Sequence, residues 1–136
     1  MTARGVAQYV GENQLASGGA TEGGRPKFET TAEGSGTILG TPARVMGTYW
    51  SKVMADGSLY GKIPSQGVTI TQDGDMGVYT GGGVGRFKQQ GGVSFRGAIY
   101  HQEATGKLAP LNGLRLVFEW EVDGDGNAQF DLWEWK

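Results

Sequence analysis

The chain has 136 residues, with 12 Lys and Arg against 14 Asp and Glu, which predicts a single domain of nearly balanced charge. No basic stripe is interleaved with aromatic residues, so the composition argues against a nucleic-acid partner. Cysteine is absent, which excludes disulfides, thiolate metal sites and a cysteine nucleophile. Because there is neither a signal-peptide pattern nor an apolar segment of about 20 residues, we expect a cytoplasmic protein that does not enter a membrane.

Glycine accounts for 26 of the residues, well above the roughly 7% of ordinary domains. In residues 80–100 the glycines alternate with β-branched and aromatic residues. Glycine inside a strand marks a bulge, a sharp bend or a close approach of two backbones. The composition therefore predicts a small, strongly curved sheet, and a closed β-barrel needs such devices most.

Residues 1–24 are rich in small and polar residues and are expected to form a flexible leader ahead of one β-barrel domain, residues 25–136. A few apolar residues in the leader leave a second interpretation open, in which it folds onto the barrel as a short strand or turn. These residues are Val6, Tyr9, Val10 and Leu15.

From residue 25 onward the pattern predicts short strands separated by turns. The expected strands are 26–33, 35–41, 43–54, 58–63, 66–72, 76–88, 92–104, 113–123 and 127–135. Three Asp-Gly pairs, at Asp56, Asp73 and Asp123, are strong hairpin signals. No stretch has a sustained helical period, so no long helix is expected.

Two strands alternate clearly between an apolar and a polar face. The apolar face of 114–122 carries Leu114, Leu116, Phe118, Trp120 and Val122, and that of 92–104 carries Val93, Phe95, Gly97 and Ile99. Consecutive hairpins with short loops form an antiparallel meander. About eight such strands close most simply into an all-β, up-and-down antiparallel barrel without exposed edges.

Two other strands carry large side chains on both faces. In 43–54, Trp50 opposes Tyr49, and in 127–135 Phe130 opposes Trp133 and Trp135. One interpretation is a bulge that changes which face points inward. The other is that the outer face is also covered, by the leader or by a second subunit, which predicts a homo-oligomer because tryptophan is favoured at interfaces.

The glycine-rich segment resembles a hairpin of the dirigent and allene oxide cyclase-like barrels. The resemblance lies in Thr80–Phe87, Gly91-Gly92 and Arg96-Gly97, with Gly34–Gly40 and Gly47–Trp50 in keeping with it. It implies an eight-stranded antiparallel barrel, often trimeric, with a cavity for an apolar or phenolic small molecule. The chain has Val84 at the family's threonine position and a longer spacing to the next glycine. No catalytic pattern of the plant enzymes matches, so catalytic residues are unknown. The chain also resembles small uncharacterised bacterial proteins of this barrel type.

Aromatic side chains are the main candidates for binding a ligand, because those near a barrel mouth would line a pocket, and the tyrosines among them would offer phenolic hydroxyls. His101, the only histidine, continues the apolar face of strand 92–104 and is expected to point inward. The candidate ligand-binding residues are Tyr49, Phe95, Tyr100, His101, Phe118 and Trp120. No metal site and no cofactor are expected.

Two motifs that suggest ligand loops are better explained as structure. Asp123–Asn127 superficially matches a calcium loop but lacks its helical frame, and a hairpin turn is expected. Gly81–Gly85 is not followed by Gly-Lys-Ser/Thr, so a bend in a strand is expected rather than a phosphate loop. The arginines and glutamates of the strands, Arg96 and Glu121 among them, are expected to face outward.

Three functions remain open. The first is a binding module that holds a small apolar or phenolic molecule inside the barrel. The second is an allene oxide cyclase-like isomerase or cyclase that shapes a reactive ligand, with the polar candidates Tyr49, Tyr100, His101 and Glu119. The third is a structural protein that assembles through Trp133 and Trp135. The first is preferred, because the sequence offers no paired acid and base.

Overall fold

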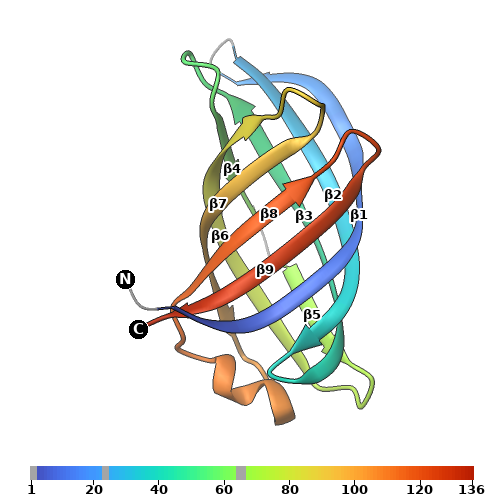
Figure 1. Ribbon diagram of the computed structural model, residues 1–136, viewed down its shortest axis with the longest axis vertical. Helices are drawn as coiled ribbons and strands as arrows, with labels where there is room; N and C mark the ends of the chain where they lie inside the picture. The colour runs from blue at the N-terminus through green and yellow to red at the C-terminus, as the bar shows by residue number, and fades with distance from the viewer. Residues whose placement is uncertain (1–2, 23–24, 64–66) are drawn as a thin grey trace.

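A computed structural model describes the backbone of residues 3–22, 25–63 and 67–136, and the side chains from residue 26 onward within these ranges. Its elements form one antiparallel β-barrel with a short 3₁₀ helix at one end (Figure 1). The elements are β1 (Ala3–Glu22), β2 (Arg25–Ile38), β3 (Thr41–Val53), β4 (Leu59–Lys62), β5 (Gly67–Thr71), β6 (Met76–Phe87), β7 (Val93–Gln102), η1 (Gly106–Leu111), β8 (Leu116–Val122) and β9 (Asn127–Trp135).

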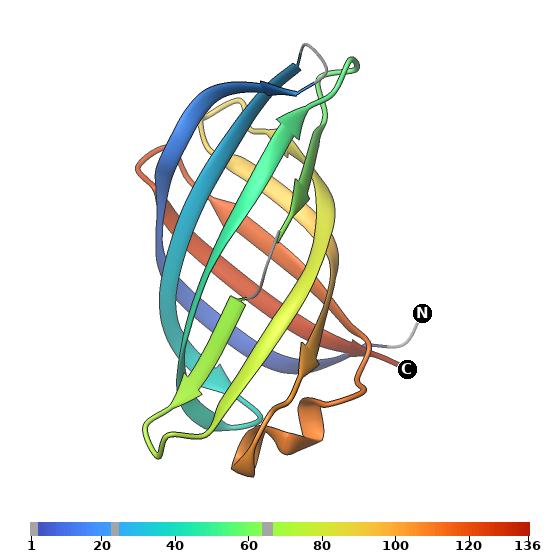
Figure 2. The ribbon, with the colours of Figure 1, turned by 180° about the vertical axis from the view of Figure 1, so that it is seen from behind.

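The barrel closes because β1 pairs with both β2 and β9, while β2 also pairs with β3. Figure 2 shows that β4 and β5 follow one another between β3 and β6, and both pair with these two strands. The nine described strands therefore occupy eight positions around the barrel. Every pairing between them is antiparallel, and apart from the closing β1–β9 pair the positions around the barrel follow chain order, which confirms the expected up-and-down barrel of about eight strands.

The first strand differs from the flexible leader expected for residues 1–24. Backbone pairing runs from Ala7 opposite Ile38 to Glu22 opposite Arg25 in β2, with register shifts on either side of Ser17. On its other side β1 pairs with β9. The physical reason is closure: without β1, the backbone N–H and C=O groups along β9 and β2 would lose their partners. The hydrogen bonds on both edges offset the ordering entropy of a polar segment, and composition alone does not reveal them.

Two further elements differ from the sequence expectation. The strands expected at 26–33 and 35–41 form the single strand β2. The segment between β7 and β8 contains η1, a single helical stretch of six residues that includes Pro110 and is too short for a periodic signal. Among the described residues, no helix has the length and apolarity needed to cross a bilayer.

The core consists of inward-facing side chains of β2–β4 and β6–β9, together with two leucines of η1. Phe95 and Ile99 of β7 are 4% and 1% exposed, as the alternation predicted. Leu108 and Leu111 are fully buried, so η1 closes one end of the barrel (Figure 1). Burying a leucine, isoleucine or phenylalanine stabilises a fold by about 1.5–3 kcal/mol, which makes this interior the main source of stability.

The ambiguous strands β3 and β9 carry no extra residue in their described pairings, and the register shift between β1 and β9 lies between Gly5 and Ala7 of β1. The registers of β2 with β3 and of β8 with β9 are continuous. Phe130 and Leu132 are buried, whereas Trp135 is 50% exposed, so the alternation places Trp133 and Trp135 on the outer face. The large side chains on both faces of these strands therefore do not mark a bulge that changes which face points inward.

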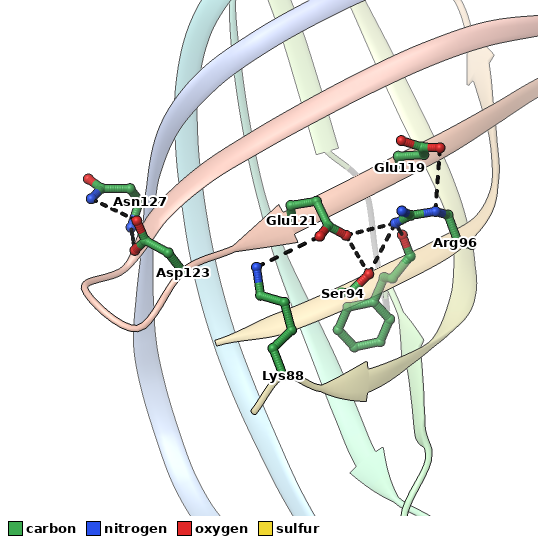
Figure 3. A network of polar contacts seen from close by, with 8 residues as sticks. Lys88, Ser94, Arg96, Glu119, Glu121, Asp123 and Asn127 are labelled. Carbon is green, nitrogen blue, oxygen red and sulfur yellow. Dashed lines mark hydrogen bonds and ion pairs between the residues drawn. The ribbon is translucent and has the colours of Figure 1, made fainter. Parts of the chain in front are cut away.

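The two motifs set aside on sequence grounds lie in the expected structures. Asp123 begins the turn between β8 and β9, and its carboxylate accepts a hydrogen bond from the N–H group of Asn127 at 2.9 Å (Figure 3) and another from that of Asp125 at 2.9 Å. Gly81–Gly85 lies within β6. These segments are a turn and a strand, which removes the calcium-loop and phosphate-loop interpretations.

Glycine in β6 and β7 allows the two backbones to approach closely. A Cβ atom at Gly97 would lie 2.2 Å from the Gly82 carbonyl oxygen, and one at Gly83 would lie 2.4 Å from that of Arg96. Both contacts are with backbone, which cannot rotate away. The curvature of the wall at this point therefore depends on glycine.

Gly97→Ala should destabilise the barrel by about 3 kcal/mol, because the added methyl group forces two paired strands apart. Gly57→Ala is the matched control, since its Cβ meets no atom within 4 Å and only a φ of +87° opposes the substitution. We expect about 1 kcal/mol there. Denaturant unfolding measures both, and equal losses for the two variants would contradict the backbone-contact argument.

Candidate functional site

The barrel encloses an apolar cavity of about 90 Å³. One side of its wall is built from aromatic and aliphatic side chains of β3 and β6–β9, and the other from small residues of β2, β3, β4 and β6. Its principal lining residues are Ala32, Gly34, Val45, Gly47, Tyr49, Gly61, Tyr79, Gly82, Gly83, Phe95, Ile99, Phe118, Trp120, Ala128 and Phe130. The charged residues among its lining, Glu33 and Lys62, are exposed and lie at its margin.

Glycine makes room for the aromatic rings that bound the cavity. A Cβ atom at Gly61 would lie 2.9 Å from the ring of Phe95, and one at Gly67 would lie 2.1 Å from the ring of Tyr79. Each ring therefore packs directly on strand backbone where a larger residue would displace it. This arrangement is familiar from sheets in which an aromatic residue covers a neighbouring glycine. It leaves the remaining interior next to β2–β4 unfilled.

Four rings of the cavity wall form a continuous series of edge contacts. Tyr49 contacts Phe95 and Trp120 with ring centroids 6.1 and 6.2 Å apart. Trp120 in turn contacts Phe130 at 5.6 Å. Such edge-to-face pairs add about 0.5–1.5 kcal/mol each beyond the area they bury. The wall is therefore a preorganised aromatic surface.

Two tyrosines and a tryptophan contribute polar side-chain atoms to the wall. Trp120 Nε1 donates a hydrogen bond to the Tyr49 hydroxyl at 3.3 Å, and the Tyr79 hydroxyl donates to the Met46 carbonyl oxygen at 3.3 Å. Burial raises the pKa of Tyr79 above its usual value, so its phenol is neutral at physiological pH. The cavity thus presents neutral hydrogen-bonding groups in an apolar surround.

The structure brings four of the six predicted site residues together. Tyr49, Phe95, Phe118 and Trp120 line the same cavity. Their proposed role in binding stays a prediction.

The other two candidates lie elsewhere. Tyr100 is on the outer face of β7 and 48% exposed, which corrects its expected place in the interior. It lies between Ile99 and His101, whose side chains face inward, so the alternation of the strand points Tyr100 outward. His101 points inward as predicted and is 3% exposed, but it lies behind Tyr79, with the two ring centroids 5.4 Å apart, and does not line the cavity.

Glu119, a candidate for an enzymatic role, belongs to a charged network on the outer face of β7 and β8 (Figure 3). Arg96 contacts Glu119 at 3.5 Å and Glu121 at 2.8 Å, and Glu121 also accepts a hydrogen bond from Ser94. Burial acts to raise the pKa of Glu121, but hydrogen bonds from Ser94 and Arg96 outweigh it and lower the pKa overall. The network is at the surface, as expected for these residues, and cannot reach a molecule inside the barrel.

Sequence reasoning missed two kinds of lining residue. Tyr79 and Phe130 belong to the aromatic set but were not singled out; the alternation of β6 and β9 could have found them. The small residues Ala32, Gly47 and Gly61 were not predicted to line a cavity. A cavity forms where small residues of several strands lie together, and this proximity exists only in the folded barrel.

No protein-family model matches the chain, and no curated protein matches it. Its fold is similar to that of three solved bacterial structures. A protein of unknown function from Clostridium acetobutylicum has a TM-score of 0.81 at 11% identity, with 100% of both chains covered. A conserved protein of unknown function from Rhodopseudomonas palustris has a TM-score of 0.78 at 10% identity, covering 98% of this chain and 96% of that one. A β-barrel-like protein from Acinetobacter baumannii has a TM-score of 0.73 at 14% identity, covering 99% and 96%.

These likenesses show the fold alone. They agree with the expected resemblance to small bacterial barrel proteins, while none of them assigns the chain to the dirigent or allene oxide cyclase-like barrels.

Tyr49→Phe should cost about 1–2 kcal/mol of folding free energy, because it leaves the Trp120 N–H without its acceptor in an apolar wall. Tyr60→Phe is the control, since Tyr60 is 47% exposed on the outer face. Urea unfolding followed by tryptophan fluorescence measures both variants. Unchanged stability of Tyr49→Phe would show that the Trp120–Tyr49 hydrogen bond contributes nothing to the wall.

Proposed function

We propose that the barrel binds a small apolar or phenolic molecule in its interior. The observation that supports this most is the cavity itself, about 90 Å³ with an aromatic wall. Small barrels ordinarily fill their interior with side chains, so an unfilled apolar volume bounded by rigid rings is suited to a ligand. In another protein an engineered apolar cavity of about 150 Å³ holds benzene or xenon. The volume here is smaller, so it admits at most one small ring or a short branched group of a larger molecule.

The polar groups of the wall support a hydroxyl-bearing ligand. Tyr49 lines the cavity, and its hydroxyl accepts a hydrogen bond from Trp120. A phenol or alcohol would make a neutral hydrogen bond there, whereas an ion would be desolvated without a counter-charge. Neutral, mostly apolar molecules are thus the preferred class.

The alternative of an isomerase or cyclase has less support. Among the four polar candidates for catalysis, Tyr49 lines the cavity, whereas Tyr100 and Glu119 lie outside the barrel and His101 lies behind Tyr79. A proton-transfer mechanism needs a group of suitable pKa within hydrogen-bond reach of the ligand. Binding is therefore placed ahead of catalysis.

Filling the cavity should abolish binding. Ala32→Leu adds bulk to a lining residue, while Ala109→Leu adds the same bulk to an exposed position of η1. Indole and phenol serve as probes measured by calorimetry, and a panel of lipophilic fluorophores serves as probes measured by the change in their own fluorescence. We expect at least tenfold weaker binding for Ala32→Leu and no change for Ala109→Leu. Absence of saturable binding of every probe by the unaltered protein would reject the proposal.

We also propose that the chain self-associates through an outer apolar strip, defined as Ala98, Tyr100, Val117, Trp133 and Trp135. The register places Ala98 beside Val117 and Val117 beside Trp133 across β7, β8 and β9. At its edge Tyr100 and Trp135 are 48% and 50% exposed. Exposed aromatic side chains grouped on one face are typical of protein interfaces, where tryptophan and tyrosine contribute most of the binding energy.

The oligomeric state tests this second proposal. We expect native mass spectrometry at tens of micromolar to show a dimer or trimer, and the double variant Tyr100→Ser, Trp135→Ser to be monomeric. Phe87→Ser removes a similarly exposed aromatic residue, 55% exposed, outside the strip and should leave the assembly intact. A monomeric unaltered protein would exclude assembly through the strip.

A further inference from the structure

A buried histidine lies at the end of the barrel that η1 closes. His101 is 3% exposed, and its Nε2 atom lies 3.4 Å from the Thr69 hydroxyl. Its Nδ1 atom has no hydrogen-bond partner within the described part of the chain. Buried polar atoms are nearly always hydrogen-bonded, so a buried ring nitrogen without a partner requires an explanation.

The segment Ala104–Asn112, called the plug here, covers this histidine. Asn112 bridges to His101 through the backbone, and Ala104 packs beside the imidazole over Gly77. The plug inserts Leu108 and Leu111 into the barrel, both fully buried (the orange helix at the lower end in Figure 1).

A small number of polar contacts hold the plug in place. The Asn112 side chain accepts from Ala104 N at 2.9 Å and donates to Ala104 O at 3.0 Å, which fastens the neck of the plug. Lys107 N donates to the Asp75 carboxylate at 3.1 Å, and Thr105 N donates to Met76 O at 2.9 Å. By contrast, β5 and β6 are held by the sheet. The plug is therefore the neighbour of His101 that lies outside the sheet, and it can move without breaking the pairing of the strands.

The groups that face His101 carry no charge to balance an imidazolium ion. From β5 the neighbour is the Thr69 hydroxyl, from β6 the neutral phenol of Tyr79, and from the plug Ala104 and Asn112. Burial alone lowers the pKa of His101 to about 4.

One of the charged groups of this part of the barrel is buried. Glu134 lies on the inward face of β9, but β8 separates β9 from β7, and its carboxylate makes no contribution to the pKa of His101. Asp73 and Lys107 pair with each other at 3.0 Å on the exposed side of the plug. The closed barrel end therefore accommodates His101 only in its neutral form.

We propose that the plug is an acid-sensitive closure of the barrel: protonation of His101 opens the plug while the closed sheet remains intact. Water reaches the imidazole when the plug moves away, whereas every other neighbour of the ring belongs to the hydrogen-bonded wall. Opening also exposes Tyr79 from behind, and Tyr79 is part of the cavity wall. The device thus connects pH to access to the interior, and it stands whether or not the cavity binds a ligand.

The direction of the pH effect follows from linkage. The closed state has a lower histidine pKa than the open state, in which the imidazole has the ordinary value of 6.5. The open state therefore binds the proton more strongly, and closure is fully favoured above about pH 6.5 and lost as the pH falls toward 4. Between these values the ratio of open to closed plug rises about tenfold for each pH unit.

The chain has no cysteine, so a single introduced thiol reports opening without background. Ala104→Cys places the thiol in the plug and Ala128→Cys places it in the wall; both alanines are 7% exposed. The labelling rate by a disulfide reagent that reacts in acid is referenced to a free peptide thiol at each pH. We expect the A104C thiol to react at least tenfold faster at pH 5 than at pH 7.5, and the A128C thiol to react equally slowly at both.

Replacing the histidine identifies the trigger. His101→Gln in the A104C background should remove the acceleration, since no group at this position then titrates. Equal acceleration of both thiols would mean that the whole barrel unfolds, and acceleration that persists in H101Q would mean that another group is responsible. If H101Q does not fold, the imidazole titration of the unaltered protein by NMR decides: a pKa of 6.5 with the plug still closed overturns the proposal.

Discussion

The structure depends on direct contact between aromatic rings and bare strand backbone. Phe95 occupies the space above Gly61 and Gly85, and Tyr79 occupies the space above Gly47 and Gly67, so any Cβ at Gly61, Gly67 or Gly85 would enter a ring. The same absence of side chains brings β6 and β7 close together at Gly97. Curvature and the cavity both follow from this constraint, because a strand with ordinary side chains could neither bend so sharply nor accept a ring against its backbone.

Different interactions dominate inside and outside the barrel. Inside, apolar burial and ring contacts dominate, and the polar atoms of the cavity wall are neutral. Outside, the Arg96–Glu119–Glu121 network is partly exposed, so its ion pairs are screened by solvent and each contributes little to stability. A charged group inside would lack this screening. The division explains why a neutral molecule suits the cavity, and why the closed barrel opposes the ionisation of His101 as it does that of Tyr79.

The likeness to bacterial barrels of unknown function extends over the whole chain but remains at the level of architecture. One fold serves many functions, so an argument about function has to come from the site. Here the site offers shape, an apolar wall and one oriented phenol, and these are the properties of a binding module. The aromatic outer strip is independent of the cavity, so assembly and ligand binding stand or fall separately.

The sequence by itself determined the strands from residue 41 onward, the hairpin turns and the inward faces of β7 and β8, because alternation and Asp-Gly turns are local signals. It also identified Tyr49, Phe95, Phe118 and Trp120, which the structure brings to one cavity. Tertiary structure alone decided that the polar segment Ala3–Glu22 becomes the closing strand, since its hydrogen bonds depend on β2 and β9. It alone decided that Tyr100 faces outward and that Ala32, Gly47 and Gly61 leave a hollow. An empty volume is set by residues far apart in the chain, and no local pattern encodes it.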